Sequence, residues 1–191
     1  MLDSGQLVVA TDGGSFWLVD VATETCEECY FYHSGSPVPD ETVFGGVQAV
    51  SPHPTRNAVF ASVGEDKLLG VWDGSQRKRM LTGHLPEMAR ALDWSPDGNH
   101  IAVGFVGGHF GVYDANTMMR VAWHHRAQEA IDVVRFSPDG RQVATGSHEN
   151  VIDLYDVRKN FHHRKRLTGH SSSIKKLDWS EDSKILQVEE A

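Results

Sequence analysis

The chain has 191 residues, of which 40% are hydrophobic and 23% charged, and its formal net charge is −8. This acidity argues against nucleic acid as a partner, because generic DNA and RNA binders gain most of their affinity by neutralising phosphates. No apolar run approaches eighteen residues, two cysteines give no disulfide framework, and the N-terminus lacks a signal-peptide pattern, so we expect a cytoplasmic protein that does not span a membrane.

The first 44 residues are expected to hold part of a β-structured unit. QLVVA and SFWLVD have the character of a second and a third strand. The long connection FYHSGSPVPDETVFGG (31–46) follows them, either as a loop that contacts a partner or as a tolerated insertion. Cys26 and Cys29, with His33 nearby, give the best metal-like spacing. A zinc site needs about four ligands, however, so we expect no metal and no redox role here.

The rest of the chain repeats itself every 42 or 43 residues. The turn sequence Ser-Pro-Asp-Gly, or a variant of it, recurs at Pro54, Pro96, Pro138 and Glu181. About 17 residues after each of the first three turns comes an apolar stretch that ends in an aromatic residue and an aspartate, at Asp73, Asp114 and Asp156. Such a fixed period is the sequence signature of a repeat architecture.

Each repeat is expected to form four short antiparallel strands. Ser-Pro-Asp-Gly suits a tight turn, the flanking stretches are short and rich in β-branched or apolar residues, and no helical spacing of apolar residues is sustained. About 42 residues for four strands, with Trp-Asp and Gly-His pairs, is typical of a WD40 β-propeller blade. The fold class predicted is therefore all-β, with about four to four and a half blades.

The period predicts one propeller segment over residues 1–191. Its parts are a partial blade (1–44), three full blades (45–81, 82–123 and 124–167) and a second partial blade (168–191). The preferred hypothesis is an open arc of a larger propeller. The alternative is a closed ring of four blades, in which SIKKLDW supplies the first strand of the N-terminal blade.

No blade carries a complete set of the polar residues that usually tie a WD40 blade together. His84 belongs to a blade with Tyr113 in place of the tryptophan, and Asp66 and Trp72 belong to a blade with no Gly-His pair. We therefore expect the blades to depend more than usual on apolar stacking between sheets.

Three stretches give the chain a resemblance to a known family. They are VATGSHENVIDLYDV (143–157), TGHSSSIKKLDWSEDSKILQV (168–188) and the turn SPHP (51–54), and together they resemble the echinoderm microtubule-associated protein-like family over about residues 5–188. The resemblance implies tandem atypical propellers, binding to tubulin or microtubules, a cytoskeletal location and no catalysis. The family's coiled coil and its hydrophobic motif are not visible, so the resemblance implies part of one propeller.

Two basic clusters are the predicted partner-binding residues. They lie at equivalent places two periods apart, just before the two LTGH sequences, and consist of Arg77, Lys78, Arg79, Arg164, Lys165 and Arg166. On an acidic chain they would create local positive potential suited to the acidic surface of tubulin. The competing interpretation is that they are solvated residues that protect exposed outer strands.

A second functional hypothesis is a general WD40 scaffold for proteins or peptides, with no preference for tubulin. Adjacent histidines at 124–125 and 162–163 cannot both face one site from a strand, so we expect solvated or packed histidines, with a cluster at a blade junction as the alternative. Neither a phosphate-binding glycine loop nor a nucleophile elbow is present, so we expect neither an enzyme nor a cofactor.

Overall fold

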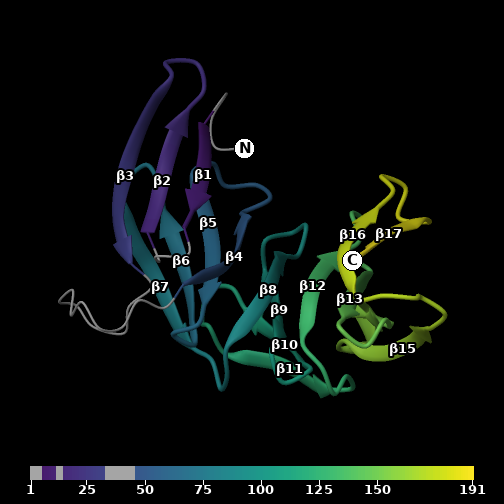
Figure 1. The fold of residues 1–191 in the computed structure, drawn as a ribbon. Helices are drawn as coiled ribbons and strands as arrows, with labels where there is room; N and C mark the ends of the chain where they lie inside the picture. The colour runs from purple at the N-terminus through teal and green to yellow at the C-terminus, as the bar shows by residue number, and fades with distance from the viewer. Residues whose placement is uncertain (1–5, 12–14, 33–45) are drawn as a thin grey trace. The chain divides into compact units, whose positions relative to one another are not determined.

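The computed structural model describes residues 6–11, 15–32 and 46–191, and divides into two compact units, residues 1–88 and 89–191. The elements described are β-strands and one short 3-10 turn, η2 (Val157–Lys159) (Figure 1). Within these described residues, no helix has the length and apolar character that crossing a membrane requires.

The first unit contains two antiparallel sheets. The N-terminal sheet has three strands, in the order β1 (Gln6–Ala10), β2 (Ser15–Asp20) and β3 (Thr25–Tyr32). The next sheet has four strands in chain order, namely β4 (Val47–Pro52), β5 (Val59–Gly64), β6 (Leu68–Asp73) and β7 (Lys78–His84). Phe16 of β2 packs with Phe60 and Trp72 of this second sheet, so an aromatic cluster joins the two sheets within the unit.

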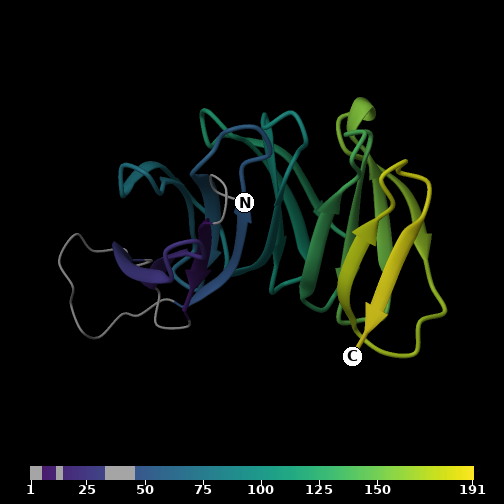
Figure 2. The same cartoon turned by 90° about the horizontal axis from the view of Figure 1, so that it is seen from above.

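The second unit contains two four-stranded sheets and a two-stranded one (Figure 2). The strands of the first are β8 (Ala89–Trp94), β9 (His100–Phe105), β10 (His109–Asp114) and β11 (Arg120–His125). Those of the second are β12 (Ile131–Phe136), β13 (Gln142–Ser147), β14 (Ile152–Asp156) and β15 (His162–Leu167), and those of the third are β16 (Ile174–Trp179) and β17 (Leu186–Glu190). Strand β12 packs against β8 on one side and against β16 on the other, so the three sheets stack.

The predicted fold class is confirmed, because each full period forms one antiparallel four-stranded sheet. The described strands form no closed sheet. Strand β16, which the ring hypothesis assigned to the N-terminal sheet, pairs with β17 instead. This pairing is the one that the open-arc prediction expects. Strand β7 continues to His84, beyond the blade boundary that the spacing placed at residue 81.

The repeated turn is built by the same hydrogen bonds in three sheets. Ser95 donates from Oγ to Asp97 Oδ1 at 2.5 Å, and the same hydroxyl accepts from the backbone N–H of His100 at 2.9 Å. The equivalent serines, Ser137 and Ser180, repeat both bonds. The serine and the aspartate therefore fix the turn locally, which explains why they recur with the period.

Glycine lets neighbouring sheets of the second unit approach closely. A Cβ atom placed on Gly104 would lie 2.6 Å from Cγ2 of Ile131, and one on Gly146 would lie 2.5 Å from Cγ2 of Ile174. The two pairs are one period apart and connect the second strand of one sheet with the first strand of the next. Each isoleucine fills the space that the glycine leaves open, so the sheets do stack through close apolar contacts.

Candidate interaction surfaces

The first basic cluster lies at the start of β7, the last strand of its sheet. Arg77 forms an ion pair with Glu27 on β3, inside the same unit, and the guanidinium carbon of Arg79 lies 5.7 Å from the centre of the Trp72 ring. Lys78 is exposed. The cluster therefore offers positive charge to solvent, although Arg77 shares its charge with a carboxylate.

The second basic cluster lies on β15, which is also the last strand of its sheet. Arg164 is exposed and donates from Nη1 to Gln142 Oε1 at 2.8 Å, and Lys165 is exposed beside it. Arg166 is different, because its guanidinium turns inward to the carboxylate of Asp153. The structure thus places five of the six predicted residues at exposed positions and the sixth in an internal ion pair.

Asp153 is the centre of a polar network that sequence reasoning did not find. Its side chain is only 4% exposed and accepts from Arg166 Nε at 3.0 Å, from Arg166 Nη2 at 2.7 Å and from His163 Nε2 at 2.7 Å. Burial raises the pKa of the Asp153 carboxyl, but the hydrogen bonds from Arg166 and His163 outweigh burial, and the net pKa is lowered. The bonds to Asp153 in turn raise the pKa of Arg166. Arg166 is therefore a structural residue of this sheet.

A second charged cluster forms beside a bulge that recurs in the first strand of four of the five described sheets. Strands β4, β8, β12 and β16 each carry a bulge after their first residue, and the extra residues are Gln48, Arg90, Asp132 and Lys175. A bulge re-aims the side chain of the extra residue. In the second unit, Asp132 accepts from Arg90 Nη1 at 3.1 Å and from Lys175 Nζ at 2.7 Å, so it links the sheets on both sides of its own.

His148 completes this cluster, with Nδ1 at 3.1 Å from Asp132 Oδ2. Burial raises the pKa of the Asp132 carboxyl, while hydrogen bonds from Lys175 and Arg90 lower it more, so its net pKa is lowered. The carboxylate is 9% exposed, whereas the side chains of Arg90 and Lys175 are each more than 40% exposed. Positions 90, 132 and 175 are one period apart, and this alignment was the signal that sequence reasoning missed.

The other sequence-derived candidates differ in how far the structure describes them. Cys26 on β3 is exposed and free, and the described side chains contain no group of three His, Cys, Asp or Glu residues placed to hold a metal ion. His33 and most of the 31–46 connection lie outside the described residues.

Of one adjacent histidine pair, His163 bonds to Asp153 while His162 is exposed, as alternation along a strand requires.

Comparison with known proteins assigns the family. The protein-family model that describes the second β-propeller of the echinoderm microtubule-associated protein matches residues 47–191. Echinoderm microtubule-associated protein-like 2 of Rattus norvegicus is 39% identical over 137 residues, which are 70% of this chain and 21% of that protein. The 77 kDa echinoderm microtubule-associated protein of Strongylocentrotus purpuratus is 32% identical over 138 residues, which are 71% of this chain and 20% of that protein.

Echinoderm microtubule-associated protein-like 3 of Homo sapiens is 37% identical over 137 residues, which are 70% of this chain and 15% of that protein. The chain thus spans about a fifth, or less, of the length of these relatives. The match covers all four strands of three sheets and the two strands of the last. By this match and by its repeated sheets, the chain belongs to the echinoderm microtubule-associated protein family, as a segment of its second β-propeller.

Proposed function

We propose that this chain is a non-catalytic WD40 interaction segment that binds tubulin or microtubules in the cytoplasm. The observation that carries the proposal is the family match over residues 47–191, because the relatives that it resembles are named as microtubule-associated proteins. Each unit works as a frame of strands that presents charged side chains to the partner, without chemistry of its own.

The residues proposed to contact the acidic partner are the exposed members of the two basic clusters, Lys78, Arg79, Arg164 and Lys165. Each pair is exposed on the last strand of a four-stranded sheet, beyond which no further described strand is hydrogen-bonded. Long, exposed cations attract an acidic surface and increase the rate of encounter, and this attraction weakens as salt is added. Arg77 and Arg166 make a smaller contribution, because Glu27 and Asp153 already neutralise them.

The test is co-sedimentation with polymerised tubulin of a variant that carries serine at positions 78, 79, 164 and 165. Its matched control carries serine at four exposed cations elsewhere, Arg56, Lys67, Arg120 and Arg126. Both variants lose four positive charges, so a general charge effect weakens both equally. We expect at least tenfold weaker binding for the first variant and a smaller change for the control. Equal losses would reject the assigned residues. A folded wild-type chain that does not bind would reject the tubulin function and favour a scaffold for another partner.

A further inference from the structure

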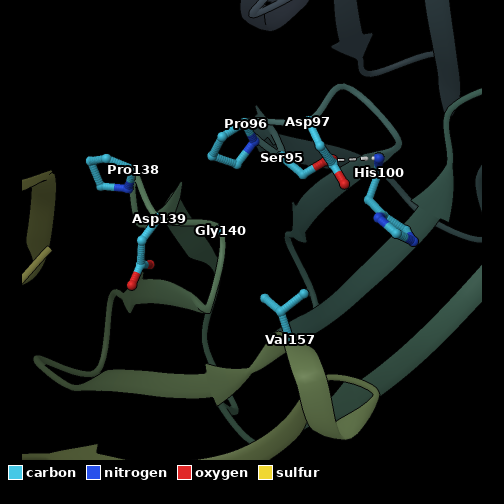
Figure 3. A pocket seen from close by; sticks show the side chains of 8 residues that line it. All are labelled: Ser95, Pro96, Asp97, His100, Pro138, Asp139, Gly140 and Val157. Atoms are coloured by element: carbon cyan, nitrogen blue, oxygen red, sulfur yellow. Dashed lines mark hydrogen bonds between the residues drawn. The ribbon is translucent and has the colours of Figure 1, made fainter.

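A pocket of about 350 Å³ lies between two of the repeated turns in the second unit. One wall is the turn between β8 and β9, the other is the equivalent turn between β12 and β13, and Val157 of η2 lies at the base (Figure 3). The residues that line it are Ser95, Pro96, Asp97, His100, Pro138, Asp139, Gly140 and Val157.

One glycine leaves part of the pocket wall unfilled. Gly140 and Ser183 occupy equivalent places in successive turns, and both have a positive φ, of 67° and 59°. Ser183 Oγ accepts a hydrogen bond from the backbone N–H of Asp139 at 3.1 Å, which bridges the turns at the next junction between sheets. Gly140 has no hydroxyl with which to make the same bond to Asp97. A Cβ atom on Gly140 would meet only Pro96, with Cδ at 3.8 Å, so the space beside it is unfilled.

The lining of the pocket combines negative charge with apolar surface. Asp97 and Asp139 stand on opposite walls, and none of the eight lining residues is a lysine or an arginine. Burial raises the pKa of both carboxyls, but hydrogen bonds from Ser95 to Asp97 and from Ser137 to Asp139 help to lower each net pKa below its ordinary value. Both carboxyls are therefore ionised at neutral pH. The prolines and the valine form the apolar part of the lining.

Nearby cations neutralise this charge only in part. Arg141 Nε lies 3.6 Å from Asp139 Oδ2, and the side chain of Arg141 is more than half exposed, so the pair is weak. Arg158 also lies close enough to Asp139 to favour its ionised form. The Asp97 carboxylate has neutral hydrogen-bond donors, Ser95 and Asn99, and His100, which also lines the pocket, makes a smaller contribution to the lowered pKa of Asp97. Negative charge thus remains on the Asp97 side of the pocket.

We propose that this pocket binds the side chain of one lysine or arginine from a basic, extended segment of a partner protein. The methylene stem lies against Pro96, Pro138 and Val157, and the cationic head lies between the two carboxylates, as long charged side chains commonly do at apolar surfaces. At about 350 Å³, the pocket is near the lower limit for ligand sites, which suits a single side chain. This site has the opposite charge to the basic clusters and does not depend on tubulin binding.

The test is titration of the full chain, observed by backbone amide chemical shifts, with three acetylated and amidated tripeptides, Gly-Lys-Gly, Gly-Arg-Gly and Gly-norleucine-Gly. We expect the lysine or the arginine peptide to shift the amides of Asp97, Gly98, Asp139 and Gly140 in a saturable way, with a Kd on the order of 1–10 mM. The norleucine peptide, which has the same stem as lysine without the charge, should bind at least tenfold more weakly.

Two variants distinguish this pocket from general attraction of cations. Gly140→Ser copies Ser183, which already adopts the same backbone conformation, so the variant is expected to fold, to fill part of the pocket and to bridge its two turns as Ser183 does. The double variant D97N/D139N retains the turn geometry and removes the charge. Each should weaken binding of the cationic peptides at least tenfold, with unchanged amide shifts elsewhere in the sheets. Unchanged binding by either variant, equal binding of the norleucine peptide, or no saturation for both cationic peptides would each overturn the proposal.

Discussion

Arg166 donates two hydrogen bonds to the buried carboxylate of Asp153, from Nε to Oδ1 at 3.0 Å and from Nη2 to Oδ2 at 2.7 Å. The two residues are direct cross-strand partners on β14 and β15. The same guanidinium also donates to the backbone oxygen of Arg126 at 2.7 Å, and Arg126 lies just after β11. One arginine of a basic cluster therefore fastens two neighbouring sheets of the second unit, while the residue before it remains exposed.

Replacing Arg166 with alanine should destabilise the fold by about 2–3 kcal/mol, because it leaves the buried Asp153 carboxylate with less compensation. The value lies below that for a fully buried pair, since the Arg166 side chain is 33% exposed. Lys165→Ala, at the exposed neighbouring position, is the matched control and should change stability by less than about 0.5 kcal/mol. Denaturant unfolding of both variants gives the comparison, and equal effects would contradict the structural role of Arg166.

Gly146→Ala should destabilise the protein by about 1–3 kcal/mol, because the new methyl group would overlap Cγ2 of Ile174 and Cγ1 of Val133. The overlap should outweigh the usual gain from replacing a strand glycine with alanine, about 0.5–1 kcal/mol. The check is a double-mutant cycle with Ile174→Ala, which removes one of the two clashing groups. The double variant should be more stable than the sum of the single effects by at least about 0.5 kcal/mol. Strict additivity would mean that the two residues do not pack as described.

Ser62→Ala should lower stability by about 1 kcal/mol, because the indole Nε1 of Trp72 donates to Ser62 Oγ at 2.6 Å in the interior of the first unit. Ser75→Ala is the control, since the Ser75 hydroxyl donates a hydrogen bond to Asp73 Oδ1, but at an exposed turn. Thermal unfolding, together with tryptophan fluorescence, measures both effects. An effect at Ser75 as large as that at Ser62 would contradict the importance of this buried bond.

Glu190 should make stability depend on pH in acid. Hydrogen bonds from Ser171 and His170 lower the pKa of its carboxyl to about 2 in the folded chain. Because the folded-state pKa lies below the unfolded value of about 4.3, the stabilisation is complete above that value and is lost as the pH falls towards 2. The stability difference between the wild type and Glu190→Gln should therefore shrink over this range. Glu189→Gln is the control, and a difference for Glu190→Gln that stays constant from neutral pH to pH 2 would contradict the assignment.

The strands and turns could be predicted from the sequence because their causes are local. The serine and aspartate of each turn bond within a few residues, so their period reports the structure directly. The pairing of Asp153 with Arg166 could not be predicted in this way. It depends on cross-strand register, and a bulge after Leu154 shifts that register along β14 and β15. If β14 and β15 paired without a bulge, the register counted from the turn between them would place a different residue opposite Asp153.

The charged cluster around Asp132 was missed for a related reason. Arg90, Asp132 and Lys175 are equivalent in the repeat, yet only the bulges at these positions turn their side chains towards one another across the sheets. The open pocket, by contrast, had a visible signal, namely the change from glycine at 140 to serine at 183 in otherwise similar turns. The structural effect of this change lies at the next junction between sheets, where Ser183 Oγ accepts a hydrogen bond from the backbone N–H of Asp139.

Binding of the wild-type chain to polymerised tubulin over a series of salt concentrations tests the central claim most directly. The account predicts saturable co-sedimentation at low salt that weakens steadily as salt is added, because exposed cations on β7 and β15 meet an acidic surface. A folded, monodisperse chain that stays in the supernatant at every salt concentration would contradict the proposed function. Binding that salt does not change would contradict the electrostatic basis of the contact.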